Sequence, residues 1–422
     1  MRPTAIVMNM FYSGLGVARS LDEQGIPVIG LTARRGIYGN YTRCATVRVC
    51  PDSREEPEAL LPFLLQLGAE LSGRAVIFPT RDDDVLFLDS YREPLSRYFD
   101  LVLPRTEVVR ACLDKWESYL QACRAGVESP RSWLIQGLPD LERAAEAISY
   151  PCVMKPLSSH LWRKHNNWER VGGRKAIAIY SRQQLVAEYA QISLADLRVL
   201  LQEMVPGGDD QLFIAACYLD KDSQLVASFT AQKLLQCPAG FGTGCIVQTV
   251  DRRELVELAA SLLKSMGFSG IAEVEFKFDA GCGRYKLIEI NPRPWDQHAL
   301  GRASGVDLIH LAYCEHAGLP MPDVRAAEPG HKWLAEDVYM ATALRMIWTR
   351  DPQFRSLCAL ARGKRTYGIW CSRDKRPFLI YMAKFVPQLI WMGMRRIGIM
   401  LGRHFRDKMS ASDERRSQDA KV

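Results

Sequence analysis

The sequence predicts a fold that combines α/β and α+β parts, and three observations support this prediction. Short strand-like runs alternate with helical stretches in the first hundred residues. Residues 270–291 hold two strand-like runs with acidic side chains among the apolar ones, and a basic stretch with apolar spacing follows residue 320. The 422 residues, 48% of them hydrophobic and 24% charged, suffice for two or three domains. We therefore place the divisions at 1–106, 107–320 and 321–422.

The first division begins as a β-α-β unit. A strand-like run at 4–8 precedes a glycine turn and a helix at 13–21, and a second strand follows at 26–31. The turn lacks the three-glycine fingerprint and no acidic residue closes the second strand, which disfavours a dinucleotide-dependent oxidoreductase. A further strand at 75–80 leads into one arginine and three aspartates at 81–84. These side chains either face a ligand at the edge of the sheet or form a helix N-terminal turn stabilised by the helix dipole.

Residues 271–279 and 285–291 predict a β-hairpin, because only a short Ala-Gly-Cys-Gly turn separates them. The hairpin places Glu275 and Glu289 side by side, with Asn291 two residues on, on the same face. Two adjacent carboxylates repel each other unless a cation lies between them, and an amide oxygen adds a neutral ligand. These three residues are therefore a predicted Mg²⁺ site, with Mn²⁺ as the alternative metal. Arg293 adds a fixed cation suited to a phosphate or a carboxylate.

The run Glu-x-Phe followed by Ile-Glu-Ile-Asn-Pro-Arg resembles the metal-binding end of the ATP-grasp superfamily, the fold of biotin carboxylase, carbamoyl phosphate synthetase and the D-alanine ligases. Residues 16–21, 27–31 and 38–43 resemble the carboxylate-amine ligase-like branch that includes D-aspartate ligase. The resemblance implies an α/β pre-ATP-grasp domain, then a two-lobed ATP-grasp unit, then a helical C-terminal extension.

Two lysines occur where the ATP-grasp pattern places nucleotide contacts. Lys115 opens a helical stretch at the place of the first such lysine. Lys155 ends an apolar strand, before a proline, and resembles the lysine that contacts the α and β phosphates as a point charge.

The stretch 199–207 resembles the hinge whose backbone hydrogen-bonds the adenine edge. The resemblance therefore implies ATP contacts at Gln202, Glu203 and Val205, and it places Asp210 near the ribose.

The Gln-Lys step at 232–233 resembles that of the biotin carboxylase branch, which implies that Lys233 assists the acyl substrate and the terminal phosphate. The resemblance implies catalytic roles for Lys233 and Arg293, as groups that neutralise developing charge. The loop at 158–175 departs from the family pattern, because only its end is rich in glycine. It is either a lid that orders on substrate or a solvated basic loop.

The resemblance implies an ATP-dependent ligase acting on a small-molecule carboxylate and an amine, with a homodimer as an expected assembly. The carboxylate would take the γ-phosphate as an acyl phosphate, and the amine would then displace phosphate. The alternative is an ATP-binding regulatory or membrane-docked subunit without ligase activity. The intact set of Glu275, Glu289, Asn291 and Arg293 argues against that alternative, because a retired site needs no metal ligands.

The positive charge belongs to the C-terminal end. The net charge is +7, yet residues 362–422 carry 15 Lys and Arg against 5 Asp and Glu. The stretch 378–401 mixes apolar and basic residues, which suits a helix on anionic lipid, a helix packed on the core or a surface for a partner protein. Residues 410–422 have the composition of a disordered end. No nucleic-acid-binding motif accompanies the basic run, so a nucleic-acid partner is not expected.

Twelve scattered cysteines with no Cys-x-x-Cys indicate neither a disulfide framework nor a zinc site. Neither a secretory signal nor a membrane-spanning stretch is evident. We expect a cytoplasmic protein, with peripheral contact at the inner face of the membrane as the alternative.

Overall fold

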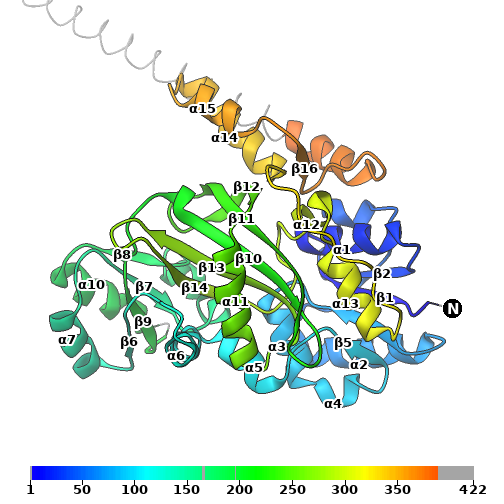
Figure 1. The fold of residues 1–422 in the computed structure, drawn as a ribbon, viewed down its shortest axis with the longest axis horizontal. Coiled ribbons are helices and arrows are strands. Elements are labelled where there is room, and N and C mark those ends of the chain that lie inside the picture. Colours follow the sequence, from blue (N-terminus) through cyan, green and yellow to red (C-terminus); the bar gives the residue numbers. More distant parts are fainter. Residues whose placement is uncertain (1, 164–166, 195, 388–422) are drawn as a thin grey trace, which may run out of the picture.

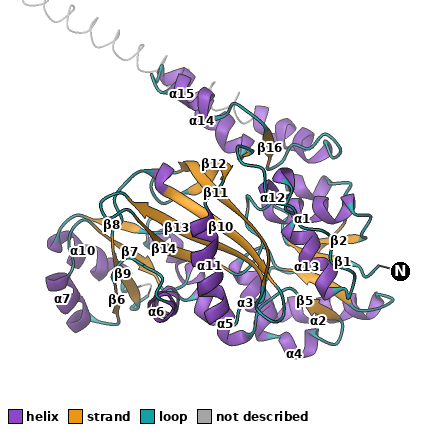
Figure 2. Cartoon of the chain, in the orientation of Figure 1, coloured by secondary structure: helices purple, strands orange, loops and turns teal. Residues whose placement is uncertain are grey.

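The computed structural model describes residues 2–163, 167–194 and 196–387, which form three sheets covered by helices (Figure 1). Strands of the largest sheet run through the middle of the molecule, with helices on either side (Figure 2). One sheet is parallel and another antiparallel throughout, so the structure confirms the predicted mixture of α/β and α+β parts.

The N-terminal domain is built on a parallel sheet with strand order β3-β2-β1-β4-β5. Its strands are β1 (Ala5–Met8), β2 (Val28–Thr32), β3 (Thr46–Val49), β4 (Ala75–Phe78) and β5 (Phe99–Leu101). Its helices are α1 (Tyr12–Glu23), η1 (Tyr38–Tyr41), α2 (Pro57–Glu70), α3 (Asp82–Ser90), α4 (Arg92–Leu95) and α5 (Thr106–Leu113). The predicted β-α-β start is confirmed, since β1 and β2 pair in parallel on either side of α1.

Gly14, in the first turn of α1, is required for a steric reason. A Cβ atom on Gly14 would lie 1.8 Å from the carbonyl oxygen of Asn9, so no other residue fits there without a shift of the backbone. The turn therefore needs glycine for close backbone approach.

The small lobe is an antiparallel sheet with strand order β6-β9-β7-β8. Its strands are β6 (Ser132–Ile135), β7 (Cys152–Pro156), β8 (Ile177–Ile179) and β9 (Val199–Glu203). Its helices are α6 (Lys115–Ala125), α7 (Leu138–Ala147), α8 (Ser159–Arg163), α9 (Asn167–Arg170) and α10 (Arg182–Ile192).

The unusual loop at 158–175 contributes to the core of this lobe. Trp162 and Val171, which flank the undescribed residues 164–166, are 1% and 0% exposed and join the apolar cluster under β7. The described parts of this loop are therefore anchored in the lobe and are not a wholly solvated surface segment.

The large sheet has strand order β14-β13-β10-β11-β12-β15-β16. Its strands are β10 (Leu212–Leu219), β11 (Leu225–Cys237), β12 (Thr243–Val250), β13 (Gly270–Asp279), β14 (Arg284–Asn291), β15 (Lys332–Leu334) and β16 (Arg365–Tyr367). The associated helices are η2 (Asp209–Gln211), α11 (Arg253–Ser265), α12 (Ala299–Ser304) and α13 (Leu308–His316). Because β15 pairs with β12, this sheet continues past the predicted division at residue 320.

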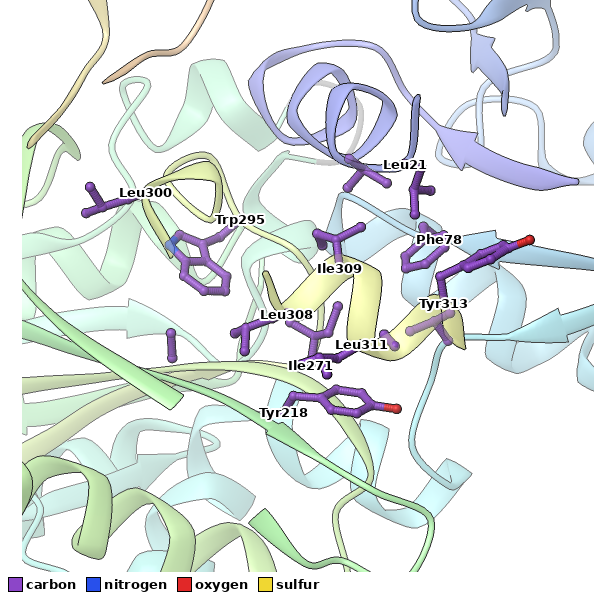
Figure 3. Close-up of a cluster of buried hydrophobic side chains, with 14 of the residues drawn as sticks. Leu21, Phe78, Tyr218, Ile271, Trp295, Leu300, Leu308, Ile309, Leu311 and Tyr313 are labelled. Atoms are coloured by element: carbon purple, nitrogen blue, oxygen red, sulfur yellow. The ribbon is translucent and has the colours of Figure 1, made fainter. Parts of the chain in front are cut away.

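Helix α13 joins the N-terminal domain to the large sheet. Figure 3 shows it between Leu21 of α1 on one side and Tyr218 and Ile271 of the sheet on the other. All three side chains are buried in one apolar cluster. Burial of this shared core fixes the edge of the parallel sheet relative to the large sheet.

The C-terminal extension is tied to the N-terminal domain by buried charges. It contains α14 (Glu336–Thr349), α15 (Phe354–Leu360) and a helical stretch at 376–387. Asp374 is fully buried and lies 3.1 Å from the guanidinium of Arg19 on α1. The rings of Tyr381 and Tyr38 meet edge to face at 6.3 Å between centroids. The described start of the predicted 378–401 helix thus contacts the N-terminal domain through Tyr381.

Residues 388–401 of that helix, and the predicted disordered end at 410–422, lie outside the described residues. Within the described ranges, no helix combines the length and the apolar character needed to cross a bilayer.

Candidate functional site

A cavity of about 420 Å³ lies between the small lobe, the large sheet and the edge of the parallel sheet. Ten of the eleven residues predicted from the sequence line it: Lys115, Lys155, Gln202, Glu203, Val205, Lys233, Glu275, Glu289, Asn291 and Arg293. These residues come from segments spread over almost 180 positions of the chain.

The predicted hairpin forms as expected and presents its acids to the cavity. Strands β13 and β14 pair antiparallel, and Glu275 lies directly opposite Glu289. Asn291 is the register partner of Glu273, one step along the same face. Two carboxylates beside an amide suit Mg²⁺, which proteins hold with one or two carboxylates while substrate phosphates supply further oxygens.

Each of the two predicted metal ligands is paired with a lysine. Lys233 Nζ lies 2.5 Å from Glu275 Oε1, and Lys115 Nζ lies 3.2 Å from Glu289 Oε1. Burial opposes the charged form of Glu289, yet Lys115 holds the pKa of this carboxyl below its usual range. In the described chain no three His, Cys, Asp or Glu side chains form a metal site by themselves. The donor set therefore fits a metal whose shell is completed by a bound ligand.

Lys155 and Lys115 are brought together by β7 and the start of α6. The backbone N–H of Lys115 donates to the carbonyl of Leu157, just after β7, at 2.8 Å. Lys155 Nζ donates to Gln202 Oε1 at 2.8 Å. Burial, and then the charge of Lys115, lower the pKa of Lys155 to about 8. Two lysines held this close attract a polyanion.

The hinge connects β9 to the large sheet and places Glu203, Met204 and Val205 on the cavity wall. Asp210 is not among the lining residues, and its backbone carbonyl accepts from Gln232 Nε2 at 2.7 Å. A ribose contact by Asp210 stays a prediction.

A second loop, at 238–243 between β11 and β12, lines the cavity and was missed by the sequence analysis. Asp209 holds it by accepting from the backbone N–H of Gly240 at 3.0 Å. Lys175 Nζ donates to Thr243 Oγ1 at 3.0 Å, which links this loop to the one at 158–175. The signal was present as Gly240, Gly242 and Gly244, a spacing typical of a loop with close backbone approach.

The parallel sheet contributes the far end of the cavity. Asp82, at the start of α3, lies 2.6 Å from Arg293 Nη2. Burial opposes its charge, but Arg293 holds the pKa of Asp82 below its usual range. Asp84 instead accepts from the backbone N–H of Arg81 and closes the first turn of α3. The helix N-terminal turn is therefore confirmed for the three aspartates, and Asp82 also lines the cavity, where a ligand contact stays a prediction.

Glu273 also lines the cavity and was missed. It is 3% exposed, and its Oε2 accepts from Asn291 Nδ2 at 3.0 Å, while its Oε1 has no partner within the part of the chain that the structure describes. Burial, and then the charge of Glu275, raise its pKa to about 8. The period of two along β13 was the available signal, because it puts Glu273 on the same face as Glu275.

The model of the carbamoyl-phosphate synthase L chain ATP-binding domain matches residues 230–322. D-aspartate ligase of Enterococcus faecium (strain Aus0004) is 21% identical over 318 residues, which cover 72% of this chain and 73% of the ligase. The carbamoyl phosphate synthase large chain of Arthrobacter sp. (strain FB24) is 24% identical over 326 residues, which cover 71% of this chain and 27% of the synthase.

Solved structures share the fold at low identity. The biotin carboxylase–β,γ-ATP complex from Campylobacter jejuni has a TM-score of 0.59 at 18% identity and covers 76% of this chain and 72% of its own. The Hydrogenobacter thermophilus 2-oxoglutarate carboxylase biotin carboxylase domain, a dimer with MgADP, ADP and bicarbonate, has a TM-score of 0.60 at 17% identity and covers 77% and 72%. These matches confirm the predicted resemblance to the ATP-grasp superfamily.

Proposed function

We propose that this chain, which has the ATP-grasp fold, is an ATP-dependent ligase that joins a small-molecule carboxylate to an amine and releases ADP and phosphate. One observation carries the proposal. The β13–β14 hairpin turns Glu275 and Glu289 into a cavity that also holds Lys115, Lys155 and Lys233. A cavity with paired acids for a metal and several cations for phosphates suits phosphoryl transfer from a nucleotide.

Glu275, Glu289 and Asn291 would hold Mg²⁺, with Mn²⁺ as the alternative. When bound, the metal would neutralise charge on phosphate oxygens. Lys115, which is paired with Glu289, and Lys155 would bind the phosphates as point charges. The hinge at 203–205 would contact the adenine edge through its backbone.

Lys233 and Arg293 would stabilise the charge that develops during transfer. The carboxylate oxygen attacks the γ-phosphorus, the bond to the ADP oxygen breaks, and an acyl phosphate forms. The neutral amine nitrogen then attacks the acyl carbon, the bond between that carbon and the phosphate oxygen breaks, phosphate leaves, and the nitrogen gives up a proton to solvent. No side chain serves as a covalent nucleophile in this scheme, so the protein acts by positioning and by charge.

Phosphate release from ATP, measured against a panel of carboxylates and amines, tests the proposal. Glu289→Gln is expected to lower turnover roughly a hundredfold or more, as the loss of a charge contact in the transition state would. Glu257→Gln is the matched control, since this glutamate is 65% exposed in a surface pair with Arg253. Full turnover in a folded Glu289→Gln protein would refute the metal assignment.

ATP binding by the wild type without turnover on any pair would favour the alternative, an ATP-binding regulatory subunit without ligase activity. A homodimer and a cytoplasmic location belong to the proposal. Peripheral membrane contact is the less favoured location, because the helix at 376–387 packs through Tyr381 on Tyr38 of the N-terminal domain.

A further inference from the structure

The acidic side chains around the cavity differ in whether a lysine or arginine pairs with them. Six acids line it: Asp82, Glu203, Glu273, Glu275, Glu289 and Asp296. Four of them lie within 4.0 Å of a lysine or arginine nitrogen. The other two, Glu273 and Asp296, accept only from neutral groups in the described part of the chain. Their donors are the amide of Asn291 at 3.0 Å and the hydroxyl of Ser13 at 2.8 Å.

Glu273 has an unmet hydrogen-bonding requirement. The side chain is 97% buried, and its Oε1 has no partner among the described residues. A buried carboxylate oxygen without a donor is costly, and most buried polar groups in native proteins have one. Glu273 forms part of the cavity wall, but this oxygen is closed to the cavity, so a ligand supplies the donor once the side chain shifts toward it.

The position of Glu273 indicates which ligand this is. Glu273 lies two residues before Glu275 on β13, opposite Asn291, and so it is on the Asn291 side of the predicted metal pair. Glu273 and Asp296 both act electrostatically on Arg293, which is held by Asp82 of the parallel sheet. Glu273 and Asp296, the two acids that form no ion pair among the residues that the structure describes, therefore share the end of the cavity away from Lys155 and the hinge.

We propose that Glu273 and Asp296 bind the amino group of the acceptor amine. The inference rests on the proposed ligase function and adds the group that recognises the second substrate. An amine supplies several N–H donors on one compact atom, and its charged form complements two carboxylates that lack a basic partner. A substrate carboxylate would be repelled there, whereas Arg293 and Lys233 would attract it. This arrangement places the nitrogen beside the groups that would hold the acyl phosphate.

Separate measurement of the two half-reactions tests this assignment. Acetate, succinate and bicarbonate serve as acyl donors, and methylamine, glycine and both enantiomers of alanine and aspartate serve as acceptors. Hydroxylamine at high concentration traps the acyl phosphate as a hydroxamate without the natural acceptor. Glu273→Gln keeps the shape of the side chain and the bond to Asn291, and Asp296→Asn keeps the acceptor for Ser13. Burial and Glu275 raise the pKa of Glu273 to about 8, so the assays are run at pH 9, where each substitution removes a negative charge.

Glu273→Gln is expected to raise the KM of the acceptor amine at least about tenfold, as the loss of a charge-assisted hydrogen bond would. Asp296→Asn is expected to raise it less, because Asp296 is only partly buried. The KM for ATP and the rate of hydroxamate formation should stay within about twofold of the wild type. Glu257→Gln again serves as the control.

An unchanged KM for the amine in Glu273→Gln would overturn the proposal. Equal losses for ATP, hydroxamate and amine would also overturn it, since they indicate a structural role. The proposed function fails separately, if the wild type forms no hydroxamate with any acyl donor.

Discussion

Replacement of Lys155 by methionine is expected to weaken ATP binding about tenfold to a hundredfold and to abolish a proton uptake that accompanies binding. Methionine keeps the length of the stem and removes the ammonium. The physical basis is the lowered pKa of Lys155, about 8, which burial and Lys115 produce in the ligand-free cavity.

The size of the effect follows from linkage. Phosphates beside Lys155 should restore its pKa to at least the ordinary value of about 10.4. At pH 8 the free protein carries about half a proton on this amine, so binding should take up about half a proton. The affinity for ATP should be constant below pH 8 and should fall as the pH rises from 8 toward 10. Because Lys155 is partly exposed to the cavity, the binding free energy gained from its restored pKa is at most about 3 kcal/mol.

Isothermal titration calorimetry with a non-hydrolysable ATP analogue measures both quantities. Titrations at pH 8 in two buffers of different ionisation enthalpy give the number of protons taken up. Lys264→Met is the control, because this lysine is exposed and contacts only Gln224 at 3.2 Å. Wild-type affinity or undiminished proton uptake in Lys155→Met would refute the role of Lys155.

Two further predictions concern stability. Burial lowers the pKa of His298 to about 4. Between pH 6.5 and 4 the unfolded state therefore binds a proton that the folded state does not. The free energy of unfolding should fall by at most about 3 kcal/mol as the pH is lowered through this window. Urea unfolding at pH 7 and 4.5 should show a smaller pH dependence in His298→Asn, and an equal dependence would contradict the argument. Deletion of 375–422 should lower the midpoint of thermal unfolding, because it uncovers Tyr38, which Tyr381 contacts. An unchanged midpoint by calorimetry would show that the helix at 376–387 contributes nothing.

The fold class and ten of the cavity-lining residues were predictable because their signals are local. A four-residue turn joins β13 to β14, so chain connectivity alone brings Glu275 opposite Glu289. Lys155 likewise stands at the end of a continuous apolar run, which predicts a buried strand. The signal was weaker for the glycines at 240–244, because their spacing predicts a loop but not the cavity that the loop lines.

Sequence by itself determined the β-α-β start and the acidic hairpin, because hydrophobic period and turn length set these features within a few residues of chain. The site lysines followed from the resemblance of their motifs to those of the ATP-grasp superfamily. Only the tertiary structure decided the pairs that span the molecule. Asp82 meets Arg293 across 211 positions, and Arg19 meets Asp374 across 355. Whether an acid is neutralised, as Glu275 is, or is left with an unpartnered oxygen, as Glu273 is, depends on which distant side chains packing brings within hydrogen-bonding distance.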